Sequence, residues 1–391
     1  MLKRAVEADL KSYIKGKDRK IFFLWGPRRS GKTTLLKKLS HSLKVPMFNF
    51  DLQSDAEKFA PRREVLEKIV SEHSIILIDE VQNYPESTLA LKILHDEYNV
   101  KIIATGSSEL RQKSGKDFDT LAGRSTESFC LPLSIAEIAD NAPVFAYDQK
   151  VFEQNLMTNL QIFGAYPEVY LASTHQAKIA LLQNIFDTYV LKDIAKIYDL
   201  KNQKLAKDIL TKIALQLGSE VSVREIANSL QANVSTVANY IEIFIKNYIL
   251  IPLPSFKTNI RRVVSENRKL FFYDLGIRNI LVKDFRETNL RPDKGGVFEN
   301  FIVSELEKGR KNLHANQNLY FYREYGGREV DLIVEDYYKH YLSVEIKISG
   351  KNIKKNIFPL PHTFFTIDTT NYFETIKKIQ RIFQGGHRHP D

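Results

Sequence analysis

Residues 26–34 form a short loop, Gly-Pro-Arg-Arg-Ser-Gly-Lys-Thr-Thr, between the apolar run 21–25 and a helical pattern. Glycine at both ends allows tight turns, so that backbone N–H groups can surround phosphates. Lys32 adds a charge for the outer phosphates, Thr33 offers a hydroxyl to Mg²⁺, and the following helix directs its positive end at the same anion. The predicted ATP-binding residues of this loop are Gly26, Pro27, Arg28, Arg29, Ser30, Gly31, Lys32, Thr33 and Thr34.

Strand patterns at 21–25, 45–50, 75–80 and 100–105 alternate with helical patterns over the first part of the chain. This alternation predicts an α/β fold with a doubly wound parallel sheet and helices on both faces. Residues 150–215 carry long helical patterns without a convincing strand, which predicts a helical lid.

Two acidic residues end the strand pattern at 75–80. A carboxylate at the C-terminal end of a strand lies beside the phosphate loop in such a sheet. We therefore expect Asp79 to hold Mg²⁺ and Glu80 to polarise the attacking water. Thr105 or Ser107, after the next strand, is a candidate sensor of the γ-phosphate, with ordinary turn chemistry as the alternative. Arg124 follows a tight turn and is either an arginine finger, often supplied to a neighbouring subunit, or a structural arginine.

These motifs resemble the AAA-type ATPase domain that occurs with a DUF4143-like C-terminal region. The matching pieces are the loop at 26–34, Ile-Asp-Glu-Val-Gln, Ala-Thr-Gly-Ser-Ser, Leu-Ala-Gly-Arg, Phe-Gly-Ala-Tyr-Pro-Glu and Phe-Phe-Tyr-Asp-Leu-Gly. The resemblance covers nearly the whole chain and implies ATP and Mg²⁺ as cofactors, ATPase activity and a homo-oligomer such as a hexameric ring. The ATPase core is expected at 1–145 and the helical lid at 146–204.

A winged helix-turn-helix is predicted at 205–290. The apolar positions of 223–230 and 236–244 lie on one face of each helical pattern, and Ser235 can cap the second helix. A hairpin with Lys257, Arg261, Arg262, Arg268 and Lys269 follows as the wing. Residues 201–290 hold 14 Lys and Arg against 8 Asp and Glu, which favours DNA over the alternative of a protein contact. The predicted DNA-binding residues are Thr236, Asn239, Tyr240, Lys257, Arg261 and Arg262.

The segment 291–391 combines a helix with Glu299, a strand with Asp331 and a second strand with Glu345 and Lys347. Residues two apart on a strand share a face, so Glu345 and Lys347 do, and Asp331 can join them from the neighbouring strand. Carboxylates bind Mg²⁺, and the lysine can orient or help deprotonate an attacking water. The alternative is an exposed charged strand edge.

This order of residues resembles the PD-(D/E)xK nuclease superfamily, including archaeal Holliday-junction resolvases. The resemblance implies that Asp331, Glu345 and Lys347 are catalytic and that Glu299 is a peripheral metal ligand. Val330 stands where the family pattern has a proline.

The composition bears on the cellular compartment and on the class of protein. A single cysteine, Cys130, excludes an intramolecular disulfide framework and fits a reducing compartment. There is no long apolar run or signal-peptide pattern, so a cytoplasmic protein without a membrane partner is expected.

The sequence favours ATP-dependent processing of double-stranded or branched DNA with Mg²⁺-dependent cleavage. A nucleotide-controlled switch that binds DNA or a protein without cutting is the alternative, and a regulator that binds no nucleic acid is a third possibility.

Overall fold

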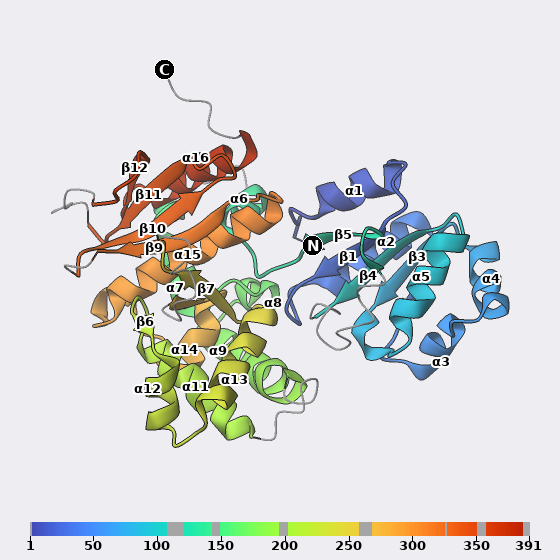
Figure 1. Ribbon diagram of the computed structural model, residues 1–391, viewed down its shortest axis with the longest axis horizontal. Coiled ribbons are helices and arrows are strands. Elements are labelled where there is room, and N and C mark those ends of the chain that lie inside the picture. The colour runs from blue at the N-terminus through green and yellow to red at the C-terminus, as the bar shows by residue number, and fades with distance from the viewer. Residues whose placement is uncertain are drawn as a thin grey trace. The chain divides into compact units, whose positions relative to one another are not determined.

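The computed structural model describes residues 2–107, 121–142, 149–194, 202–257, 268–324, 327–349 and 357–385. Two compact units divide the chain, Met1–Leu131 and Pro132–Asp391, and Figure 1 shows their elements. Two predicted DNA-binding residues, Arg261 and Arg262, lie outside the described residues. Within the described ranges, no helix is long and apolar enough to cross a membrane.

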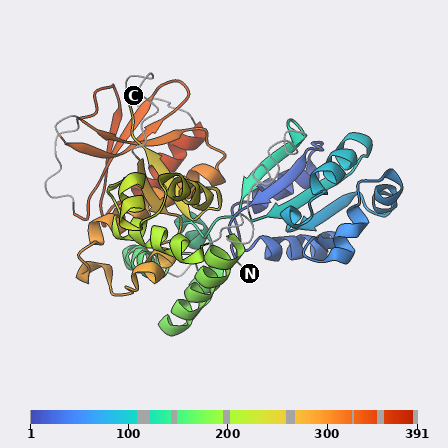
Figure 2. The ribbon, with the colours of Figure 1, turned by 60° about the horizontal axis from the view of Figure 1, so that its bottom comes forward.

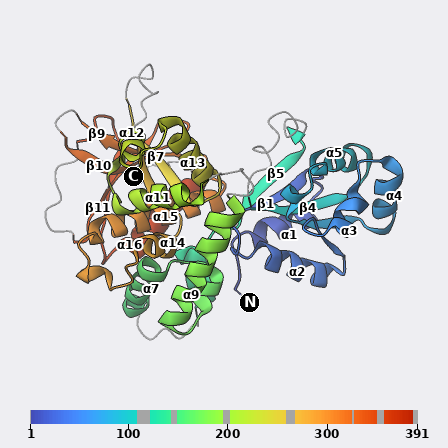
Figure 3. The same cartoon turned by 90° about the horizontal axis from the view of Figure 1, so that it is seen from below.

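A parallel five-stranded sheet forms the centre of the N-terminal unit, with the strand order β2-β3-β4-β1-β5. The strands are β1 (Ile21–Trp25), β2 (Met47–Asn49), β3 (Ile75–Asp79), β4 (Lys101–Gly106) and β5 (Ser125–Phe129). Helices lie on both faces of this sheet (Figure 3). They are α1 (Glu7–Lys15), α2 (Lys32–Leu43), α3 (Gln53–Ala56), α4 (Arg63–Glu72) and α5 (Ser87–Glu97). The predicted α/β fold with a parallel sheet is confirmed.

The two faces of β1 explain why its run is wholly apolar. Phe22 and Leu24 share a buried cluster with Leu10 of α1 and Leu36 of α2. Alternate residues on a strand point to opposite faces. Phe23 and Trp25 stack on each other, with ring centroids 4.9 Å apart, and both are fully buried. Burial on both faces is typical of a central parallel strand.

Helices form the first part of the C-terminal unit, as the sequence predicts. They are α6 (Ile135–Asn141), α7 (Gln149–Phe163), α8 (Pro167–Leu171), α9 (His175–Ile185), the π-helix η5 (Phe186–Asp193) and α11 (Gln203–Leu215). Their buried residues share one core with α12 (Val223–Ser229), α13 (Val234–Lys246) and α14 (Leu275–Val282). The predicted lid and the predicted helix-turn-helix therefore pack together.

A small antiparallel sheet joins this helical part to the C-terminal sheet. It has the order β6-β8-β7, with β6 (Glu220–Val221), β7 (Leu250–Pro254) and β8 (Arg268–Phe272). The pairing of β7 with β8 confirms the predicted hairpin strands. Beyond β7, the N–H of Phe256 donates to the carbonyl of Phe321 at 2.7 Å, so the hairpin is hydrogen-bonded to the next sheet.

The last part of the chain contains a four-stranded sheet with the order β12-β11-β10-β9 (Figure 2, orange and red). Its strands are β9 (Asn318–Arg323), β10 (Glu329–Glu335), β11 (Tyr341–Ile346) and β12 (Thr363–Ile367). The accompanying helices are η7 (Thr288–Leu290), α15 (Lys294–Asn312) and α16 (Tyr372–Gly385). The predicted order of helix, strand, strand and helix omitted β9 and β12, and β5 of the first unit was also missed.

Candidate nucleotide and metal sites

The phosphate loop lies between the end of β1 and the start of α2. Gly26 packs against the backbone of Cys130, because a Cβ at this position would lie 2.0 Å from the Cys130 carbonyl oxygen. Gly26 has φ +157° and Gly31 has φ +104°, values that favour glycine, and Arg29 between them has φ +62°. This backbone course explains why glycine is needed at both ends of the loop.

Lys32 is 3% exposed and points back into the loop. Its Nζ donates to the carbonyl oxygens of Gly26 and Pro27 at 2.7 and 2.8 Å. Burial lowers the pKa of this ammonium, while the nearby Glu80 and Asp79 raise it. A phosphate ligand would compete with two carbonyl oxygens for this charge. Thr33 is half-buried and Thr34 exposed at the start of α2.

Arg4 holds the loop from outside the motif, a role that no sequence motif indicates. Its guanidinium is buried and donates to the carbonyl oxygens of Ser30 and Leu131, both at 2.5 Å. The Ser30 hydroxyl in turn donates to the carbonyl of Pro27 at 2.8 Å. Arg4 therefore holds the loop to the segment that follows β5.

The acidic pair lies at the C-terminal end of β3, beside the end of β4. The Thr105 hydroxyl donates to the carboxylate of Asp79, and the Glu80 N–H donates to Thr105 Oγ1 at 3.4 Å. Gln82, which the sequence analysis did not select, donates from Nε2 to the Glu80 carboxylate and to Ser107 Oγ at 3.1 Å. Thr105 and Ser107 are fully buried. The structure thus brings Asp79, Glu80, Thr105 and Ser107 together, with Gln82 as their link.

Arg124 lies at the other edge of the sheet. β1 and β5 run parallel, with Ile21 opposite Ser125, so Arg124 precedes the N-terminal end of β5 while the phosphate loop follows the C-terminal end of β1. Its Nε donates to Asp96 Oδ1 at 2.7 Å. This hydrogen bond lowers the pKa of Asp96 to about 2. Arg124 cannot reach the phosphate loop of its own chain, which leaves only a neighbouring copy for the predicted finger role.

In the C-terminal unit, Asp331 and Glu345 lie on the paired strands β10 and β11, next to Lys347. Lys347 Nζ is 3.1 Å from Asp331 Oδ2 and 2.9 Å from Glu345 Oε1. The Ile346 N–H also donates to Asp331 Oδ2 at 2.7 Å. Burial lowers the pKa of Lys347, but Asp331 and Glu345 more than offset it, so the pKa is raised. Burial and then Asp331 raise the pKa of Glu345.

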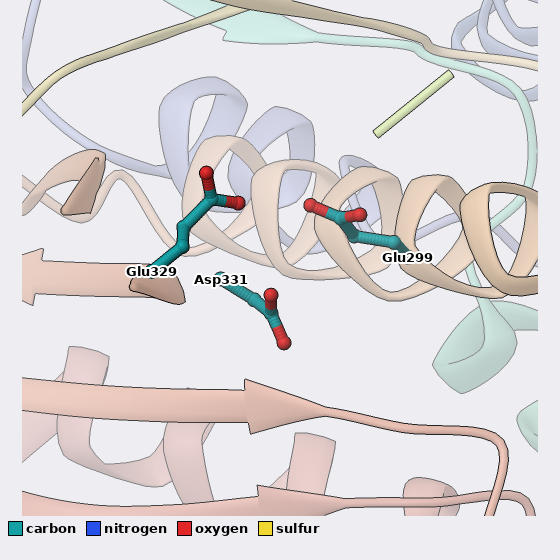
Figure 4. Close-up of side chains that lie close together, drawn as sticks. All are labelled: Glu299, Glu329 and Asp331. Carbon is teal, nitrogen blue, oxygen red and sulfur yellow. The ribbon is translucent and has the colours of Figure 1, made fainter. Parts of the chain in front are cut away.

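Two more carboxylates extend this group (Figure 4). Glu299 of α15 and Glu329 of β10 point toward one another beside Asp331, and oxygens of the three lie within 4.8 Å. The Glu299 side chain is 13% exposed, and this burial raises its pKa to about 7. The sequence analysis missed Glu329, although its spacing of two from Asp331 on one strand places both on the same face.

Lys269 of β8 is buried and does not lie on the exposed wing surface that was predicted for it. It is 1% exposed, with Nζ 2.8 Å from Glu299 Oε1 and in contact with the Glu329 carboxylate. These two carboxylates raise its pKa although burial lowers it. A lysine in this position cannot face DNA, because its charge is already enclosed by Glu299 and Glu329. Arg268 pairs with Glu242 at 2.7 Å.

The predicted DNA-binding residues on α13 divide into exposed and buried ones. Asn239 is exposed and Thr236 partly exposed, whereas Tyr240 is 5% exposed and packs in the core. Tyr240 was therefore wrongly expected to be available to a groove. The helix begins at Val234 after Asn233, so Ser235 does not cap it. Lys257 is partly buried after β7.

Models of three protein families match separate parts of the chain. Residues 18–139 match the family model described as AAA domain. The N-terminal unit contains a P-loop ATPase domain of the AAA class. Residues 154–288 and 294–361 match two domains of unknown function, DUF8612 and DUF4143. These matches support the predicted association of an AAA domain with DUF4143, but they give no activity for the C-terminal unit, and none of them supports a nuclease.

The relatives found are uncharacterized proteins. One from Haemophilus influenzae is 26% identical over 273 residues, which are 65% of this chain and 67% of that protein. One from Methanocaldococcus jannaschii is 25% identical over 355 residues, 86% of this chain and 77% of that protein. Among solved structures, DnaA of Aquifex aeolicus bound to AMPPCP has a TM-score of 0.30 and 17% identity, covering 61% of this chain and 86% of that one. RuvB of Thermotoga maritima, a Holliday junction branch migration motor, has a TM-score of 0.28 and 16% identity, covering 64% and 86%.

Proposed function

We propose that this protein is an ATP-dependent DNA-processing enzyme that couples ATP hydrolysis to DNA binding and to Mg²⁺-dependent cleavage of structured or branched DNA. The observation that carries the proposal is the meeting of Asp331, Glu345 and Lys347 on neighbouring strands, with lysine contacts of 3.1 and 2.9 Å. The AAA domain in the same chain supports the ATP-dependent part.

The C-terminal residues fit a hard divalent cation. Asp331 and Glu345 offer carboxylate oxygens, the ligands that Mg²⁺ prefers, and Glu299 can add another. A bound Mg²⁺ would supply positive charge at the scissile phosphodiester. Lys347 holds its ammonium between the two carboxylates, from where it can orient an attacking water or help to deprotonate it.

The N-terminal residues fit ATP hydrolysis. Lys32 holds its ammonium inside the phosphate loop, and Thr33 lies beside it in the first turn of α2. Asp79 and Glu80 lie at the end of β3, with their carboxylates hydrogen-bonded to Thr105 and Gln82. In this proposal Asp79 helps to hold Mg²⁺, while Glu80 polarises the attacking water.

DNA binding is assigned to the exposed part of α13 and the hairpin that follows it. Of the predicted DNA-binding residues on α13, Asn239 is exposed and Thr236 partly exposed, and Lys257 lies next to β7. We further propose that the protein acts as a homo-oligomer in the cytoplasm. The positive balance of 14 against 8 charged residues at 201–290 favours a phosphate backbone as the partner.

A switch that binds DNA or a protein without cutting is the second candidate. One observation favours it: Lys269 already neutralises Glu299 and Glu329, two of the three carboxylates that lie close together. An internal cation at this position can stabilise the fold without any metal. The two candidates differ in whether the Asp331–Glu345 pair supports cleavage.

A cleavage assay on a panel of DNA forms (duplex, fork, four-way junction), with and without ATP and Mg²⁺, distinguishes the DNA-cutting enzyme from the switch that does not cut. We expect Mg²⁺-dependent cutting of branched forms, lost in Lys347→Ala and in Asp331→Asn, with DNA binding retained. Lys339→Ala is the matched control, because Lys339 pairs with Glu335 near the other end of the same hairpin. Absence of Mg²⁺-dependent cutting by a protein that binds the same DNA would favour the switch.

A further inference from the structure

Gln82 is a buried amide between two predicted residues of the ATP site. It lies in the short helix η2 (Val81–Asn83), two residues after Glu80, and is 2% exposed. Its Nε2 donates to the Glu80 carboxylate and, at 3.1 Å, to Ser107 Oγ. A side-chain amide nitrogen carries two hydrogens, so each of them has an acceptor within the candidate ATP site.

Packing holds this amide at the C-terminal end of β4. A Cβ at position 106, which is glycine, would lie 2.9 Å from Gln82 Oε1 and 2.4 Å from Trp25 Cζ3. A side chain at this position would therefore crowd both the amide and the indole ring. A buried side chain packed in this way has few rotamers available, so the Gln82 Nε2 stays in one place.

Glu80 has a backbone conformation that its surroundings must maintain. Its φ is +52° and its ψ is +46°, the left-handed region that a residue with a Cβ rarely adopts. Its N–H donates to Thr105 Oγ1 at 3.4 Å. Non-glycine residues persist in this region where neighbouring contacts hold them, and they are concentrated at active sites. The structure therefore fixes the main chain of Glu80 through Thr105 and its carboxylate through Gln82.

The Glu80 carboxylate lies close to the charge of the phosphate loop. Burial lowers the pKa of the Lys32 ammonium, and among the nearby charges Glu80 raises it most. Glu80 itself is only half-buried, so without a donor its carboxylate could turn into solvent. A glutamate side chain loses much rotamer freedom when it is fixed, and a group that polarises water acts only when it is aligned with that water. A donor that holds one orientation therefore favours turnover.

We propose that Gln82 is a positioning residue for ATP hydrolysis: its Nε2 holds the Glu80 carboxylate beside the phosphate loop, and Ser107 holds that Nε2 in turn. This inference rests on the proposed function, which assigns the polarisation of the attacking water to Glu80. The alternative is a glutamine that only packs at the end of β4. The two roles differ in what Gln82 contributes once Glu80 has been replaced.

Gln82→Met in the full chain is the direct test, because methionine keeps the length of the side chain and removes both N–H donors. We expect kcat for ATP hydrolysis to fall roughly 10- to 100-fold, the usual effect of misplacing a reacting group. ATP affinity should stay unchanged, because Lys32 and its loop are untouched. Asn83→Leu is the matched control: it removes the next amide of η2, which donates to Asp51 at 2.5 Å, and it should keep native turnover.

A double-mutant cycle with Glu80→Gln separates positioning from packing. If Gln82 acts through Glu80, Gln82→Met should lower kcat no further in a chain that already carries Glu80→Gln. Losses that multiply would show that Gln82 supports the site independently of Glu80, and they would overturn the proposal. Native or increased kcat in Gln82→Met, or a loss of ATP affinity in place of kcat, would also overturn it. If Gln82→Met does not fold, Gln82→Asn, whose amide is one methylene shorter, serves in the same measurements.

Glu80→Gln alone distinguishes a failure of this inference from a failure of the proposed function. Reduced turnover in Glu80→Gln together with native turnover in Gln82→Met counts against the positioning role only. Native turnover in Glu80→Gln counts against the role of Glu80 and overturns both.

Discussion

At the scale of single residues, Lys32 and Asp79 of the nucleotide site already have hydrogen-bond partners within the chain. Lys32 donates to the carbonyls of Gly26 and Pro27, and Asp79 accepts from Thr105. Buried polar groups require such partners, because burial without a hydrogen bond is costly. When ATP binds, Lys32 must therefore exchange its hydrogen bonds to the loop carbonyls for contacts to phosphate oxygens.

Lys32→Ala and Glu80→Gln are expected to affect different steps. Lys32→Ala removes the ammonium that is hydrogen-bonded to the Gly26 and Pro27 carbonyls, and it should weaken ATP binding as well as abolish hydrolysis. Glu80→Gln should keep ATP binding but reduce turnover by roughly 100-fold or more, the usual contribution of a positioned acid or base. Nucleotide affinity and single-turnover hydrolysis measured side by side check this. Native turnover in Glu80→Gln would show that Glu80 is not the water-polarising residue.

Motif residues could be predicted from the sequence, whereas their partners could not. Lys32, Asp79 and Glu80 were found because spacing along the chain fixes their place on a strand or loop. Arg4 and Gln82 contact the same site, but only the packing of distant segments brings them there. Lys269 was assigned to the wing surface, because a sequence does not show that two carboxylates enclose it.

At the scale of elements, a chain of charges connects four strands and a helix in the C-terminal unit. Lys269 of β8 contacts Glu299 of α15 and Glu329 of β10. Arg323 of β9 contacts Glu329 and, at 2.6 Å, Glu220 of β6. The small sheet and the four-stranded sheet are therefore held together by ion pairs, of which the Lys269 contacts are the most buried.

Replacing this lysine should destabilise the whole unit. Lys269→Met leaves Glu299 and Glu329 without their shared cation, and breaking a buried pair on one side costs on the order of 3–5 kcal/mol. Chemical denaturation at neutral pH measures this loss in the free energy of unfolding. Lys246→Met, an exposed lysine at the end of α13, is the control and should change little. Equal stability of the two variants would mean that Lys269 contributes nothing to the fold.

Glu299 makes the stability of this unit dependent on pH. Its pKa in the fold is about 7, raised from 4.5 chiefly by burial. A raised folded pKa gives a contribution to stability that is complete below pH 4.5 and is lost as pH rises through about 7. Glu299→Gln should therefore flatten the fall in unfolding free energy across this window. Denaturation curves at a series of pH values test it, with the exposed Glu374→Gln as control. Identical pH profiles for native chain and Glu299→Gln would contradict the assignment.

Strands buried on both faces were predicted from the sequence, whereas of the edge strands β2 was predicted and β5, β9 and β12 were missed. β1 and β3 are continuous apolar runs, which only a buried parallel strand explains. β5 reads Ser-Thr-Glu-Ser-Phe and lies at the edge of its sheet, while β9 and β12 are the two edges of theirs. An edge strand is partly solvated, so its apolar pattern is weak and its position depends on its single neighbour.

At the scale of the whole molecule, residues from two of the four predicted segments (1–145, 146–204, 205–290 and 291–391) share one core within the unit Pro132–Asp391. Ile162 of α7, Ile213 of α11, Val237 of α13 and Ile277 of α14 share one core. The periodicity of a helix shows that one face is apolar, but not which other face covers it. Segments that look separate in the sequence can therefore form a single unit. Sequence patterns likewise do not predict how several copies of the chain assemble.

Assembly can be tested through Arg124, which lies at the sheet edge remote from its own phosphate loop. If a neighbouring copy receives this arginine, ATP turnover per chain should rise with protein concentration, and Arg124→Ala should lower turnover while ATP affinity stays unchanged. Asp96→Asn removes the partner of Arg124 but keeps the arginine, so it should retain most of the turnover. Steady-state rates across a range of concentrations give the answer. Turnover that does not depend on concentration in a monomeric protein would exclude the role in trans.

Binding to DNA should depend steeply on salt, because each Lys or Arg that contacts a phosphate releases condensed counterions. Arg261 and Arg262, which follow β7 in the sequence, are the first candidates. Removing both should make the slope of log affinity against log salt shallower by about 1.8, since each phosphate contact on duplex DNA contributes about 0.9. Fluorescence anisotropy with a labelled junction at several salt concentrations measures this slope.

Replacement of Lys58 and Arg63, which pair with acidic residues on the N-terminal unit, is the matched control. An unchanged slope in the Arg261/Arg262 variant would place the DNA-binding surface elsewhere. The basic residues near the C-terminus, Lys354, Lys355, Lys377 and Lys378, would then be the next candidates.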